Sequence, residues 1–154
     1  MATVSNISLS IAKGSSANTS NVTVSGTMNF DASEVGKSYR LEVKIFGEDK
    51  AGDNLPSTDL IGDDQLYTFL WGGLFLKLPF KQFVVSTAGD QSFTETRVLT
   101  SDKLDEDSGQ AIIGWADIHT PILSPRKDEI YARVMLSGAP VSARSATISL
   151  GIGV

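Results

Sequence analysis

Short runs in which apolar and polar residues alternate recur along the chain, and this period of two is the feature that most limits its fold. Alternation puts one set of side chains on a core and leaves the other set in water. The clearest run is 39–45, and similar runs are 3–11, 22–30, 130–136 and 146–154. In 39–45 every second residue is large and apolar: Tyr39, Leu41, Val43 and Ile45.

Turn-forming residues separate these runs, and no stretch keeps a helical period for three full turns. Gly26 predicts a bulge within 22–30. Residues 111–119 predict a further strand, and residues 121–128, which contain two prolines, predict a loop. Many short strands between turns are typical of antiparallel folds. The sequence therefore predicts an all-β protein, an antiparallel two-sheet β-sandwich of about 8–10 strands, with a β-barrel as the alternative.

Length and composition exclude several classes of function. The 154 residues predict a single domain, 1–154. A net charge of −5 argues against nucleic-acid binding, which needs clustered Lys and Arg. Without cysteine, disulfides, thiolate catalysis and Cys-ligated metal sites are excluded. No signal peptide and no membrane span is predicted, so the localisation stays open.

The most apolar stretch covers residues 66–80, Leu-Tyr-Thr-Phe-Leu-Trp-Gly-Gly-Leu-Phe-Leu-Lys-Leu-Pro-Phe. Gly72-Gly73 lies in its middle, and two glycines between apolar runs favour a two-residue hairpin turn. The turn predicts three facing pairs: Trp71 with Leu74, Phe69 with Leu76, and Tyr67 with Leu78. We expect this hairpin to lie on a core or an interface, with four side chains mostly buried: Phe69, Trp71, Leu76 and Leu78.

An unpaired sheet edge is expected beside this hairpin. Pro79 has no N–H to donate to a β-ladder, so its strand belongs at an edge. Charges normally protect an edge from association, but only Lys77 and Lys81 are charged between residues 66 and 83. The sequence therefore predicts self-association or binding of a protein partner. The expected contact residues are Trp71, Leu74 and Phe75.

Two segments, 48–64 and 101–109, hold more than half of the chain's 18 acidic residues. Ca²⁺ takes roughly six to eight oxygen ligands, which carboxylates on loops supply. Residues 105–109, Asp-Glu-Asp-Ser-Gly, resemble a calcium-binding turn, although Ala116 stands where an EF-hand has its bidentate Glu. The candidate Ca²⁺ ligands are Asp49, Asp53, Asp105 and Asp107.

Such a metal site requires both acidic segments to lie at one end of the sandwich. An even number of chain reversals between Phe46 and Ser101 would bring the two segments to the same end. The sequence predicts three strands in this interval, or four if Pro79 splits a strand, so the number of reversals stays open. The arrangement is similar in kind to C2 domains, sandwiches whose acidic end loops bind calcium, but no C2 motif matches residue by residue. The alternative is that both segments are solvated and only keep the protein soluble.

Signals for catalysis are few. His119, the chain's single histidine, lies two residues from Asp117, but a serine hydrolase also needs a nucleophile on a sharp turn, and Gly-x-Ser-x-Gly is absent. We therefore expect no enzyme, and no cofactor apart from the candidate Ca²⁺. Carbohydrate is a further candidate ligand, because aromatic side chains stack on sugars. The aromatic residues considered are Tyr67, Trp71 and Trp115.

These features favour a non-enzymatic interaction or structural module that acts through the 66–80 hairpin. The alternative is a calcium-dependent binding domain, C2-like or carbohydrate-binding, that uses the two acidic segments.

Overall fold

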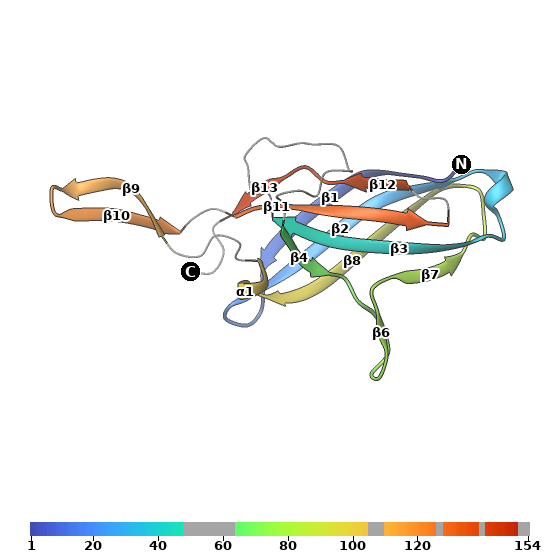
Figure 1. The fold of residues 1–154 in the computed structure, drawn as a ribbon, viewed down its shortest axis with the longest axis horizontal. Helices are drawn as coiled ribbons and strands as arrows, with labels where there is room; N and C mark the ends of the chain where they lie inside the picture. Colours follow the sequence, from blue (N-terminus) through green and yellow to red (C-terminus); the bar gives the residue numbers. More distant parts are fainter. Residues whose placement is uncertain (48–63, 105–109, 126–127, 139–140, 151–154) are drawn as a thin grey trace.

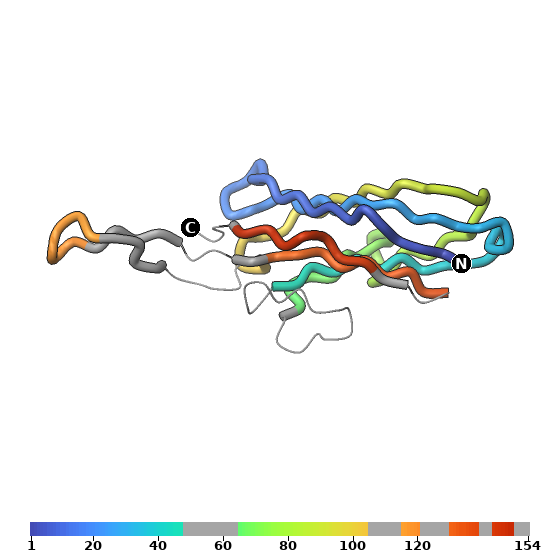
Figure 2. The backbone as a smooth tube through the Cα atoms, turned by 90° about the horizontal axis from the view of Figure 1, so that it is seen from above, coloured from blue at the N-terminus to red at the C-terminus, as the bar shows by residue number. Residues whose placement is uncertain are grey.

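Two antiparallel β-sheets face each other in the computed structural model, in which residues 1–47, 64–104, 110–125, 128–138 and 141–150 are described. The first sheet has the order β1 (Thr3–Lys13), β2 (Thr19–Phe30) and β8 (Gly89–Thr100). The second has the order β12 (Val141–Arg144), β11 (Asp128–Ser137), β3 (Ser38–Gly47) and β4 (Asp64–Thr68), while β13 (Ile148–Leu150) also pairs with β11 and β7 (Lys81–Val84) with β3. Figure 1 traces these strands, and Figure 2 shows the sheets as two layers.

The two sheets confirm the predicted all-β, sandwich-like class. They are three-stranded and six-stranded, so their nine strands fall within the predicted range. Over the described residues the sheets are not closed into a barrel, which makes the barrel alternative wrong. The helices described are η1 (Ala32–Glu34) and α1 (Ser101–Leu104), and neither is long and apolar enough to cross a membrane.

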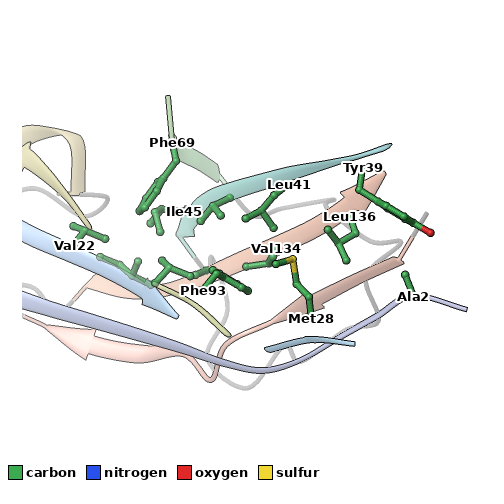
Figure 3. Packing of buried hydrophobic residues seen from close by; sticks show 14 of the residues in the cluster. Ala2, Val22, Met28, Tyr39, Leu41, Ile45, Phe69, Phe93, Val134 and Leu136 are labelled. Atoms are coloured by element: carbon green, nitrogen blue, oxygen red, sulfur yellow. The ribbon is translucent and has the colours of Figure 1, made fainter. Parts of the chain in front are cut away.

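The core lies between the two sheets and is built from the alternating positions that the sequence indicated (Figure 3). Apolar side chains at every second position point inward from the central strands because the strand period is two. Phe69, from within the 66–80 stretch, and Val85, from the segment after it, join this core. The residues of this core cluster on the central strands are Val22, Val24, Met28 and Phe30 in β2, Tyr39, Leu41, Val43 and Ile45 in β3, and Ile130, Ala132, Val134 and Leu136 in β11.

The predicted bulge near Gly26 is present, but on the neighbouring strand. β2 runs through Gly26 in unbroken register with β8, where Gly26 faces Phe93. The register shift is in β1, where Asn6 and Ile7 together face Gly26 and Asn6 has a positive φ of 54°. A Cβ atom at position 26 would lie 2.9 Å from the Phe93 ring. Glycine is needed here because the ring approaches the backbone closely.

A buried carboxylate holds the turn that carries the chain from one sheet to the other. Glu34 ends η1, and its carboxylate accepts hydrogen bonds from the Asp31 N–H and the Tyr39 hydroxyl, both at 2.8 Å. The Asp31 side chain in turn accepts a bond from the Ser33 N–H, which completes a capping box. Burial, together with the hydrogen bond to Glu34 and the charge of Glu34, raises the pKa of Tyr39.

Two short antiparallel ribbons stand apart from the sandwich in Figure 1. One is β5 (Trp71–Gly72) with β6 (Lys77–Leu78), and the other is β9 (Gln110–Asp117) with β10 (Thr120–Pro125). In the second ribbon residues 120–125 form a strand, so the loop predicted over residues 121–128 is wrong in this part. Two prolines are tolerated there because β10, as described, pairs on one side only, with β9.

Candidate interaction site

The 66–80 stretch is divided between the sandwich and a small hairpin, so the predicted register is wrong. Tyr67 pairs with Ile45 of β3, and the Phe69 N–H donates to the Val43 carbonyl at 2.9 Å. The hairpin begins only at Trp71, which pairs with Leu78, and its loop covers residues 73–76. The first part of the stretch therefore extends the six-stranded sheet.

Gly72 has a different role from the one expected. It pairs with Lys77 at the base of the loop and has a φ of +135°. A side chain at position 72 would collide with the backbone carbonyl of Leu76. Glycine is thus required for a close backbone contact in the ladder. Because Gly72 belongs to the strand pair and not to the turn, the turn consists of the four residues 73–76.

The change of register moves several large apolar side chains into solvent. Leu74, Phe75 and Leu76 are 95%, 100% and 67% exposed, and we call these three residues the apolar tip. Leu78, which was expected in the core, is also exposed. The predicted burial is confirmed for Phe69, whose exposed fraction is 0%, and is wrong for Leu76 and Leu78. Trp71 is half-buried.

Arg97 of β8 ties the base of the hairpin to the three-stranded sheet. Its Nε and Nη2 donate to the Leu70 carbonyl at 3.2 and 3.0 Å. Its guanidinium also lies 5.1 and 5.2 Å from the ring centroids of Phe69 and Trp71. Both sheets therefore hold the base: β3 binds the backbone of Phe69, and β8 binds that of Leu70. The apolar tip projects from this anchored base (Figure 1).

Exposed cations lie around the hairpin. Lys77 belongs to the hairpin itself, and Lys81 follows Pro79. The Arg40 guanidinium lies 4.3 Å from the ring centroid of Phe80. Glu95 of β8 pairs with Lys81 at 3.6 Å and with Arg97 at 3.4 Å. In the described part of the chain, Arg40, Lys77, Lys81 and Arg97 thus lie in or beside the base of the hairpin, although the whole chain carries −5.

The structure places the three predicted contact residues in two groups. Leu74 and Phe75 lie in the apolar tip, whereas Trp71 packs at the base, with its ring centroid 6.3 Å from that of Phe69. Leu76 is the tip residue that the predicted register had assigned to the core. The expected sheet edge is present, because in the described residues β7, which follows Pro79, pairs with β3 alone.

The candidate calcium ligands lie outside the described residues, which exclude 48–63 and 105–109, so Asp49, Asp53, Asp105 and Asp107 remain predictions. The described residues that flank these segments do meet. Gly47 pairs with Asp64, and α1 lies beside β4, with the Lys103 ammonium 5.5 Å from the Tyr67 ring centroid. The flanks of both acidic segments are therefore at the same end of the sandwich (Figure 1). Within the described part, no group of three or more His, Asp or Glu side chains is arranged to hold a metal.

His119 and Asp117 lie at the turn of the β9–β10 ribbon. The Asp117 carboxylate accepts bonds from the His119 N–H at 2.8 Å and the Thr120 hydroxyl at 3.2 Å, so its contacts hold the turn. Trp115, in the same ribbon, is exposed, whereas Trp71 belongs to the other hairpin. The three aromatic residues considered for carbohydrate binding therefore do not share one element.

Two of the clefts that the described residues form open on the sandwich, and His119 lines neither of them. The larger one, of about 370 Å³, lies between β7 and β8. Of its four apolar residues, Met28, Leu41 and Phe93 are buried and Phe83 is half-buried, so the cleft presents mainly polar surface. The second, of about 360 Å³, is lined by Ser38, Arg40, Gln82, Ser137 and Gly138.

Fold and site together define a β-sandwich with a projecting apolar hairpin. No family model matches the chain, and no curated protein matches it either.

Proposed function

We propose that the protein is a non-enzymatic interaction module that makes its contact through the apolar tip of the 66–80 segment. The observation that carries this proposal is the nearly complete exposure of three consecutive large side chains, Leu74, Phe75 and Leu76. Apolar groups in water favour any surface that covers them, at about 25 cal/mol per Å² buried. Contiguous exposed apolar residues accordingly mark interaction sites in soluble proteins.

The anchoring of the hairpin supports the same conclusion. Arg97 and the β3 backbone hold the base, so the tip is presented in a defined place. A presented tip loses less conformational freedom on binding than a free loop does. In water without another partner, copies of the chain are expected to cover each other's tips.

Self-association is expected to depend on Phe75. The wild-type mass from light scattering should rise reversibly with concentration from tens to hundreds of micromolar, because contacts between tips bury apolar surface. Phe75→Glu should stay monomeric, since the contact would have to desolvate a carboxylate. Val98→Glu, at an exposed apolar position of β8, is the matched control and should behave as wild type. A wild-type protein that is monomeric throughout, like Phe75→Glu, would contradict self-association through the tip.

Calcium binding by the acidic segments is a second candidate, favoured by the meeting of their flanks at one end of the sandwich. If Asp49, Asp53, Asp105 and Asp107 bind Ca²⁺ in the folded state, the ion stabilises that state by mass action. At a concentration of about 100 times Kd the melting temperature should rise by about 5–10 °C. A double variant, Asp105→Asn with Asp107→Asn, should remove the shift. An unchanged melting temperature with saturating Ca²⁺ would leave the acidic segments a solubilising role.

A further inference from the structure

We propose that the partner of the apolar tip is the surface of a lipid bilayer, into which Leu74, Phe75 and Leu76 insert. This inference rests on the proposed function and specifies its partner. It follows from three properties of the hairpin: its small contact area, the distribution of charge around it, and the exposure of its loop.

The area of the tip is too small for a stable contact between rigid proteins. Stable protein interfaces use roughly 20–30 residues on each side. The tip offers three large apolar side chains on a convex loop, with exposed Leu78 behind them. A rigid partner would need a matching apolar socket, whereas the cleft between β7 and β8 presents mainly polar surface. Hydrocarbon is fluid and surrounds a convex loop on every side, so it covers the whole tip.

The charges near the hairpin match a lipid headgroup layer. Residues 73–76 carry no charge, and exposed Lys77, Lys81 and Arg40 lie behind them. Glu95 is paired with Lys81 and Arg97. Insertion of the tip would bring the cations to the level of the lipid phosphates, where each basic residue favours binding. At physiological salt the Debye length is about 8 Å, so the headgroups respond mainly to charges close to the hairpin, among them these three cations.

The backbone limits how deep this insertion goes. Peptide groups in a loop lack the complete hydrogen bonding that the hydrocarbon core demands. Insertion by about 5–10 Å, the depth reached by interfacial helices, buries the side chains while the ladder between Gly72 and Lys77 stays among hydrated headgroups. The hairpin is therefore an interfacial anchor, and it does not span the bilayer.

Co-sedimentation of the full chain with vesicles tests the inference. Wild-type protein should bind phosphatidylcholine vesicles, and should bind about tenfold more tightly when about a third of the lipid is anionic phosphatidylglycerol. Phe75→Glu should weaken binding at least tenfold, the loss expected when a buried apolar side chain becomes a carboxylate. The matched control is Ile118→Glu, at an exposed apolar residue in the turn of the other ribbon, and it should bind as wild type.

Fluorescence of Phe75→Trp gives an independent reading of depth. The tip tryptophan should shift to shorter wavelength with vesicles, and lipids brominated near the headgroup should quench it more than lipids brominated at the chain ends. No vesicle binding, or binding lost in Ile118→Glu and kept in Phe75→Glu, would overturn the bilayer inference. If the wild type still self-associates through Phe75 while ignoring vesicles, only this inference fails. If both assays are insensitive to Phe75→Glu, the proposed function fails as well.

Discussion

Phe69→Ala is expected to lower the free energy of unfolding by about 3–5 kcal/mol, the range for truncating a fully buried phenylalanine. Phe69 is completely buried and packs against Tyr67 and Trp71, with ring centroids 5.8 and 6.3 Å apart. The truncation leaves a cavity in the core and also removes the ring beneath the Arg97 guanidinium. Urea unfolding followed by circular dichroism measures the loss.

The matched control is Phe75→Ala, the same substitution only six positions away on a fully exposed side chain. It should change stability by less than about 0.5 kcal/mol, as surface substitutions usually do. The contrast between the two phenylalanines tests the observed register directly. A loss below about 1 kcal/mol for Phe69→Ala, or equal losses for both variants, would contradict it.

Glu34→Ala should have the second largest effect, a loss of about 2–4 kcal/mol, because it leaves two donors without an acceptor. The Tyr39 hydroxyl and the Asp31 N–H both bond to this carboxylate at 2.8 Å, and Glu34 is buried. An unsatisfied buried donor costs about 1–3 kcal/mol. Glu34→Gln keeps an acceptor oxygen and should lose less. Equal losses for the two variants would show that packing, and not hydrogen bonding, explains the effect.

The hydrogen-bonded pair of Tyr39 and Glu34 also makes the free energy of unfolding depend on pH in the alkaline range. The pKa of Tyr39 in the folded state is raised above its ordinary value of 10.0, first by burial and then by the hydrogen bond to Glu34 and its charge. The folded state therefore holds this proton more tightly, so the contribution is complete below pH 10 and is lost as the pH rises through the folded-state pKa. Tyr39→Phe should remove this part of the alkaline decline. An identical decline in Tyr39→Phe would assign it to other groups.

The sequence by itself determined the class of fold and most of the core. In 39–45 and 130–136 the alternation assigns the buried face correctly, because a strand's period of two does not depend on its partner. The apolar character of 66–80 also singled out this segment, and two of its three predicted contact residues, Leu74 and Phe75, are exposed in the structure. The partner of each strand cannot be obtained in this way, since pairing depends on residues far apart in the chain.

The tertiary structure decided where the hairpin begins and which residues form its tip. Residues 69–76 are apolar on both sides of Gly72-Gly73, so no local signal separates the expected register from the observed one. Pairing of β4 with β3 places Phe69 in the core, and β5 can then begin only at Trp71. Which of the two registers forms therefore depends on the burial of the Phe69 ring between the two sheets. That burial depends on contacts between distant segments, and it leaves Leu74, Phe75 and Leu76 in solvent.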